Sequence, residues 1–144
     1  MSKEENKAII RRWLEEGWSR GNLAVADELI DEDFVVHGAG GQAVPTGPEG
    51  VKQLVSAWRT GFADGRMIVD EMLHAEGDKV VIRMTWRGTH NGVFYGVAPT
   101  GRQVSVTSMG IDRVANGKIV EGWGEVDMLG LFQQIGVISP PGQG

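Results

Sequence analysis

The sequence predicts a single α+β domain in which a curved, mostly antiparallel sheet wraps around N-terminal helices and leaves a hollow between them. Apolar residues recur at helical spacing through roughly the first 60 residues and alternate at strand spacing after them. The 22 glycines among 144 residues suit the turns and bulges of a strongly bent sheet. Helices followed by long hairpins are typical of an α+β domain, and ligand sites favour such hollows.

The N-terminal segment has a helix start signal followed by one apolar face. Ser2 and Glu5 have the spacing of a capping box. Apolar residues then recur at three- and four-residue steps, which predicts a helix over residues 3–18. Asn22 is placed to cap a short second helix that runs to about residue 30.

A short strand and a third helix follow. Residues 34–37 are mainly apolar and predict the strand, and the glycine- and proline-rich residues 38–47 predict a loop. Pro48 suits the first turn of the third helix. The buried face of that helix is expected to run from Val51 to Phe62.

The second half of the chain predicts two hairpins and a closing helix. Glu76-Gly77-Asp78 and Asn116-Gly117 are turn signals, and the second is the stronger. The strands are expected at residues 67–75, 80–87, 102–114 and 118–126. A short helix is expected near residues 128–132.

No linker interrupts residues 1–138, which predicts one domain, and residues 139–144 are expected to form a flexible C-terminal tail.

Composition excludes several classes of function. The net charge is −5 and the basic residues are scattered, which argues against nucleic acid as a partner. No apolar run approaches the roughly 20 residues that span a bilayer, so no membrane is expected. The charged N-terminus lacks the apolar stretch of a signal peptide, which predicts a cytoplasmic protein. The chain has no cysteine, and its three histidines are not at metal-ligand spacing, so no metal site is expected.

General acid–base chemistry by carboxylates and histidines remains, and the most suggestive segment is 121–127. Acidic residues alternate there with small and apolar ones, so Glu121, Glu125 and Asp127 share a face unless a glycine bulge intervenes. A carboxyl in an apolar cavity has its pKa raised toward neutral pH. The alternative is that the glutamates are solvated and Asp127 caps the terminal helix. The sequence leaves both interpretations open.

Two histidines and one tyrosine are further candidates. His37 ends a short strand before a glycine-rich loop, and His90 follows the strand that contains Trp86. Each could act as a base or donor, or be held by its surroundings in a structural role. Tyr95 could donate a hydrogen bond to a substrate oxygen or anchor the connection between hairpins.

The order of several motifs resembles a known family. Trp86-Arg87-Gly88-Thr89-His90-Asn91-Gly92 precedes Pro99-Thr100-Gly101, and Gly110-Ile111-Asp112-Arg113 precedes Asn116-Gly117-Lys118-Ile119-Val120-Glu121-x-Trp123-x-x-x-Asp127. With His37 and the helix start at Thr46-Gly47-Pro48 upstream, the chain from about residue 4 to residue 136 resembles the SnoaL-like polyketide cyclases, or ester cyclases, of the nuclear transport factor 2-like superfamily. One departure is Gly122, where the family often has histidine.

The resemblance implies a cone-shaped α+β barrel with a deep apolar pocket and an enzyme that uses no metal or organic cofactor. It implies an intramolecular aldol condensation that closes a ring in a polyketide ester, with Asp127 as the matching general acid/base. It also implies a homodimer or higher homo-oligomer through the outer face of the sheet. His37, His90 or Tyr95 would stabilise the enolate oxygen. The side chains expected to surround a small apolar carbonyl substrate are Trp13, Trp18, Phe34, Leu54, Trp58, Phe62, Met84, Trp86, Tyr95, Met109 and Trp123.

Other functions use the same parts. An isomerase, a dehydratase or an epoxide hydrolase would also need an acid–base group beside an apolar pocket. A non-catalytic carrier of small apolar molecules would need only the pocket. A protein scaffold would instead have a filled interior and a large exposed apolar patch.

Overall fold

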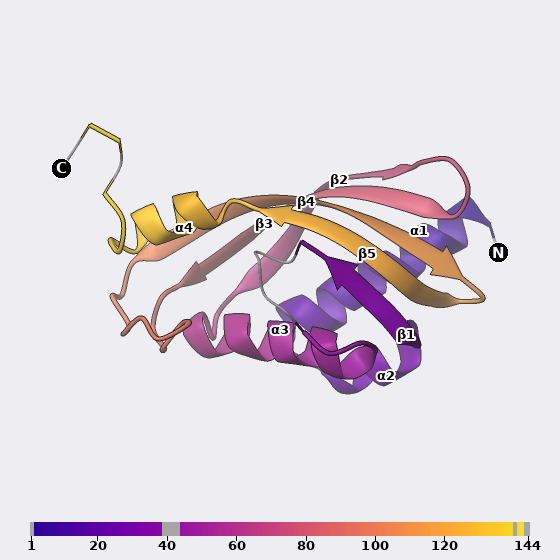
Figure 1. The fold of residues 1–144 in the computed structure, drawn as a ribbon, viewed down its shortest axis with the longest axis horizontal. Coiled ribbons are helices and arrows are strands. Elements are labelled where there is room, and N and C mark those ends of the chain that lie inside the picture. Colours follow the sequence, from indigo (N-terminus) through magenta and orange to yellow (C-terminus); the bar gives the residue numbers. More distant parts are fainter. Residues whose placement is uncertain (1, 39–43, 140, 143–144) are drawn as a thin grey trace.

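The protein is described by a computed structural model covering residues 2–38, 44–139 and 141–142. A five-stranded sheet forms one layer, and helices cover one of its faces (Figure 1). The mixed α+β fold predicted from the sequence is confirmed. None of the helices in the described part of the chain is long and apolar enough to cross a membrane.

The N-terminal helix starts as predicted but changes type at Trp13. Helix α1 spans Lys3–Arg12, and the Glu5 backbone N–H donates to Ser2 Oγ at 3.1 Å. The chain then continues as a π-helix, η1, over Trp13–Ser19. The prediction of one continuous α-helix over residues 3–18 was therefore wrong. The Trp13 ring packs across Gly17 so closely that any Cβ there would collide with it. Trp13 and Gly17 are both on the buried side of η1, and π-helical turns are frequent at functional sites.

The second helix and the first strand also differ from the prediction. Helix α2 spans Ala24–Leu29, with Leu23 as its N-cap and no side-chain capping bond. Asn22 contributes only its backbone carbonyl, which accepts from the Val25 N–H at 3.3 Å. Strand β1 spans Ile30–His37. It starts four residues earlier than predicted because Ile30 already pairs with β5, before an irregularity that lies between Ile30 and Val35.

Helix α3 spans Pro48–Gly61 and begins at the predicted proline. Its buried face includes Val51, Leu54, Val55 and Trp58.

Arg59, on the same helix, ties the helical layer together. Its Nη1 donates to the backbone carbonyls of Trp18 and Ser19, both at 3.0 Å, and of Gly65 at 2.9 Å, while Nη2 donates to that of Ala63 at 2.7 Å. One guanidinium thereby connects the end of η1 to the start of β2.

The sheet has the order β1-β5-β4-β3-β2. Strand β1 is parallel to β5, and all other neighbours are antiparallel. The two edge strands do not pair, so the curved sheet stays open and does not close into a complete barrel. The strands are β2 Arg66–His74, β3 Lys79–Thr89, β4 Gln103–Ala115 and β5 Lys118–Val126.

The turn and the helix at the end of the chain agree with the prediction. Asn116 and Gly117 have φ values of 52° and 77°, the backbone that a two-residue hairpin needs. Helix α4 spans Met128–Gln134 beyond β5. Of the predicted tail, residues 140, 143 and 144 lie outside the described residues, and so do residues 39–43 of the predicted loop.

The core divides into two parts along the sheet. One contains Ile10, Val55, Ile82 and other residues of α1, α2, α3 and the sheet. The other lies at the end near α4 and contains Trp58, Phe62, Trp86 and Phe94. Between them the space is not filled completely, and this is where the candidate site lies.

Candidate active site

A cavity of about 160 Å³ lies between the inner face of the sheet and the helices. Its wall is mainly apolar and draws on η1, α3 and all five strands. The predicted pocket residues found in this wall are Trp13, Trp18, Phe34, Leu54, Trp58, Met84, Trp86, Tyr95, Met109 and Trp123.

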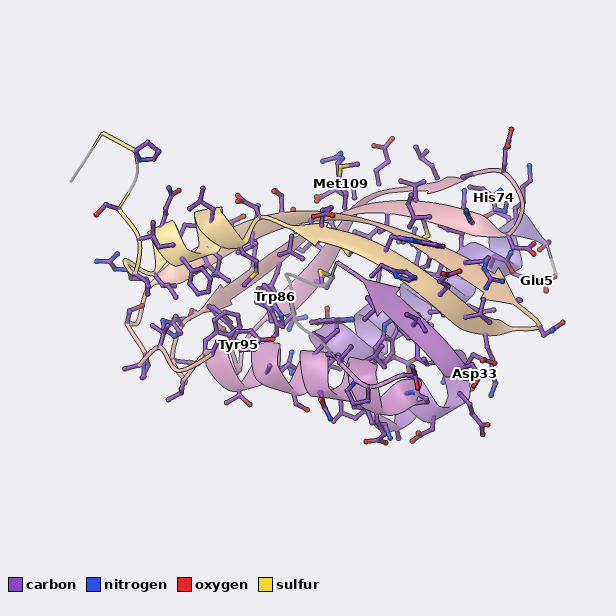
Figure 2. All side chains as sticks on the ribbon, in the orientation of Figure 1. Glu5, Asp33, His74, Trp86, Tyr95 and Met109 are labelled. Atoms are coloured by element: carbon purple, nitrogen blue, oxygen red, sulfur yellow. The ribbon has the colours of Figure 1, made fainter. Side chains whose placement is uncertain are left out.

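Three tryptophans form a rigid part of the wall. The Trp86 ring is 6.0 Å from that of Trp18 and 5.7 Å from that of Trp58, both edge to face. Edge-to-face contacts are a favoured geometry for aromatic pairs and restrict ring rotation. Figure 2 shows Trp86 on the side of the sheet that faces α3 and Met109 on the other side. Met109 is accordingly 54% exposed and contributes only an edge of the cavity.

Phe62 is the one predicted pocket residue that does not line the cavity. It is fully buried and packs on the rings of Trp58, His90 and Phe94. It lies one residue beyond α3, where the helical periodicity that suggested a cavity-facing position has ended. Its place is therefore in the core beside the cavity.

The polar groups of the wall are few, and Asp112 is the only carboxyl among its described residues. Ser108 lies on the same face of β4, four residues earlier, which places the two roughly 13 Å apart along the strand. Tyr95 lies on the β3–β4 connection, where its φ of 44° turns the chain. Burial raises the pKa of its phenol, which therefore stays protonated and able to donate a hydrogen bond.

Asp112 points to the inner face because of strand alternation. It shares parity on β4 with the buried Val104, Val106 and Val114. Removal of the carboxylate from water raises its pKa from an ordinary 3.8 to about 7. The accessible surface that the residue retains is consistent with its position on the cavity wall.

Asp127 lies outside this wall. It is exposed at the junction of β5 and α4, and its Oδ1 accepts from the Gly130 N–H at 2.9 Å. This is the helix-capping arrangement that the sequence left open as the alternative for this residue. Glu121 and Glu125 also do not line the cavity.

His90 holds the connection between β3 and β4. It is fully buried, and the Thr100 N–H donates to its Nδ1 at 3.3 Å. The Thr100 hydroxyl lies 3.0 Å from the same nitrogen. His90 does not line the cavity, so its position fits a structural role.

His37 lies on the outer face of the sheet. Its Nε2 is 3.0 Å from Glu121 Oε2, and its ring stacks on Trp123 at 5.3 Å. Trp123 thus stands on the outer face as Met109 does and contributes only an edge of the cavity. This hydrogen bond and the nearby Arg113 lower the pKa of Glu121. The two histidines and Asp127 therefore lie at three separate places, not in one constellation. No group of three or more potential metal ligands occurs among residues 2–38, 44–139 and 141–142.

The sequence contained a signal for Asp112. Asp112 alternates in register with the apolar residues of a half-buried strand, so it shares a face with Val104, Val106 and Val114. Such a residue is desolvated, and carboxyls with perturbed pKa values mark candidate functional sites. The acidic cluster at residues 121–127 is the more conspicuous pattern, but its acidic side chains do not line the cavity.

Comparison with known proteins places this geometry in a family context. The family model described as SnoaL-like polyketide cyclase matches residues 8–135. Nogalonic acid methyl ester cyclase from Streptomyces nogalater is 26% identical over 127 residues, covering 88% of this chain and 95% of the relative.

Solved structures are similar over nearly their whole length. TsrD from Streptomyces laurentii has a TM-score of 0.84 and 26% identity, covering 96% of this chain and 99% of that one. IdmH from Streptomyces antibioticus has a TM-score of 0.77 and 32% identity, covering 92% of this chain and 99% of that one. The similarity therefore extends over more than nine-tenths of this chain.

Proposed function

Because the chain belongs to the SnoaL-like polyketide cyclases, we propose that it is a cyclase that closes a ring in an apolar, polyketide-like carbonyl ester by intramolecular aldol condensation. The observation that carries the proposal is the apolar cavity with a single carboxyl among its described wall residues. An enolisable substrate needs an apolar enclosure and one group that can take and return a proton. The relative from Streptomyces nogalater, a methyl ester cyclase, supports the same class of reaction.

The cavity wall would contribute by folding the substrate. Trp18, Trp58 and Trp86 form a rigid aromatic surface against which a flexible chain can be held compact. Two carbonyl-bearing parts of one molecule then stay close, which lowers the entropic part of the barrier to ring closure. Tyr95 is the predicted donor that borders the cavity and can bind a developing enolate oxygen.

The proposal is tested by ligand binding and product formation with a matched pair of variants. Aromatic polyketide-like methyl esters are titrated against tryptophan fluorescence, and mass spectrometry or chromatography detects the cyclised isomer in the same samples. Leu54→Phe adds volume to the cavity wall, whereas Leu73→Phe makes the same change at a side chain that is 52% exposed. Urea unfolding checks that both variants fold.

Saturable quenching with a cyclised product, lost in Leu54→Phe and kept in Leu73→Phe, is the expected result. Quenching without any product would contradict the enzyme and favour a carrier of small apolar molecules. No quenching by any ester would contradict both and favour a scaffold. An isomerised or hydrolysed product in place of a ring would keep the acid–base enzyme but exclude the aldol condensation.

A further inference from the structure

We propose that Asp112 is the acid–base group of the cavity and that Gly122 is the residue that positions it. The inference rests on the proposed function for the reaction itself. It goes beyond that function by assigning the proton transfer to a residue for which the resemblance implies no role, in place of Asp127.

The placement of Asp112 depends on its neighbour on the adjacent strand. Asp112 and Gly122 are opposite each other in the antiparallel pairing of β4 and β5. A Cβ on Gly122 would lie 2.7 Å from Asp112 Oδ1 and 3.4 Å from the Phe34 ring. The carboxyl therefore occupies the space that a side chain at position 122 would need.

Open space lies beside this carboxyl. Gly110 and Gly124 form the next pair on the same face of these two strands, beyond the outward-facing pair Ile111–Trp123, and also line the cavity. Among the residues that the structure describes, a Cβ on Gly124 would meet nothing within 4 Å. The same face of β4 and β5 thus carries the carboxyl and, beyond it, a bare stretch of backbone, and we place the reacting carbon of a substrate over this stretch.

No charged side chain in the described part of the chain holds the Asp112 carboxyl in one protonation state. Desolvation is the cause of its pKa of about 7, and no hydrogen bond or opposite charge from residues 2–38, 44–139 and 141–142 offsets it. Near neutral pH both forms are then populated, and a group of this kind can serve as base and acid in one cycle. Asp127 differs because its side chain is exposed and already accepts the α4 capping bond.

This one carboxyl can carry out both proton transfers of an aldol ring closure. The Asp112 carboxylate takes a proton from the carbon next to one carbonyl, and the electron pair of that C–H bond forms the enolate. The enolate carbon bonds to a second carbonyl carbon of the same molecule, and the π pair of that C=O moves to its oxygen. The oxygen takes the proton back from Asp112, so the product is an isomer of the substrate and no co-reactant is needed.

The positioning role is tested without any substrate. Protein labelled with ¹³C-aspartate is titrated by NMR as wild type, Gly122→Ala and Gly124→Ala, and Asp112→Asn identifies the resonance. In Gly122→Ala the added methyl should displace the Asp112 carboxyl from β5 toward the open cavity. The midpoint of the Asp112 titration should then fall by about one pH unit toward the ordinary range of aspartate. Gly124→Ala makes the same chemical change into open space and should leave the midpoint within about 0.3 units. An unchanged or higher midpoint in Gly122→Ala would overturn the positioning role.

The catalytic role is tested with the esters that the wild type converts. Asp112→Asn should lower kcat by about 100-fold or more, as loss of a general acid/base does, while Asp127→Asn should stay within about threefold of wild type because asparagine caps helices as well as aspartate. In Gly122→Ala the pH profile of kcat should move with the NMR midpoint. Full activity of Asp112→Asn, or loss of activity in Asp127→Asn alone, would overturn the assignment. If no ester is converted by the wild type, the proposed function fails and the catalytic role fails with it, whereas the NMR result still decides the role of Gly122.

Discussion

Replacement of Asp112 by asparagine should make the protein more stable, and increasingly so as the pH rises. The folded state raises the pKa of this carboxyl from 3.8 to about 7. Between those values the folded protein keeps the proton that the unfolded chain has lost. The stability of the wild type should therefore fall as pH rises through this window, and the neutral amide of Asp112→Asn avoids the loss.

The size of the effect follows from the same two pKa values. A pKa difference of this size corresponds to at most about 4 kcal/mol above both values, of which about 2.6 kcal/mol develops between pH 5 and pH 8. The carboxyl borders a cavity and keeps some contact with solvent, which reduces the penalty. We expect the stability advantage of Asp112→Asn to grow by about 1–2.5 kcal/mol from pH 5 to pH 8.

Urea unfolding of both proteins at several pH values between 4 and 8 measures this difference, because other titrating groups are common to the two and cancel. Asp127→Asn is the matched control, since it makes the same chemical change at an exposed cap. Its difference from wild type should show no comparable slope. If the wild type and Asp112→Asn give parallel pH profiles, the carboxyl is not desolvated and the reasoning about the cavity wall is refuted.

Four further outcomes are expected. Arg59→Ala removes a guanidinium that donates to four backbone carbonyls. The change should lower the free energy of unfolding by about 2–4 kcal/mol in urea unfolding. A loss below about 1 kcal/mol would show that water satisfies these carbonyls as well as the guanidinium does. Asp127→Ala should lower that free energy by about 1 kcal/mol through loss of the α4 cap, and Asp127→Asn should restore it. His37→Ala removes the hydrogen bond that chiefly lowers the pKa of Glu121, so an NMR titration should show that pKa rising, and an unchanged value would refute the contact. The predicted homodimer would bury the exposed apolar side chains of the outer sheet face, which include Met109. Met109→Lys should therefore reduce the mass measured by sedimentation to that of one chain. A wild type that is already monomeric would exclude the dimer.

Local features of the fold could be predicted from the sequence because they depend on neighbouring residues. Ser2, Pro48 and the Asn116-Gly117 pair are each recognised by backbone geometry within a few positions, and all three do what the sequence indicates. The π-helical turn at Trp13–Ser19 could not be predicted in this way. It depends on how the Trp13 ring packs over Gly17 inside the completed fold.

The candidate site shows the same division. Hydrophobic periodicity by itself identified most of the side chains that line the cavity, although Met109 and Trp123 stand on the outer face of the sheet and reach only its edge. The same alternation placed Asp112 on the buried face of its strand. Only the tertiary structure decided which acidic residue borders the cavity and which caps a helix. That choice depends on the register between β4 and β5, which sets Asp112 opposite Gly122, and on the end of β5, where Asp127 turns to cap α4. Strand register and strand ends depend on contacts between residues that are distant in the chain. The alternation of apolar residues within a single strand carries no information about those contacts.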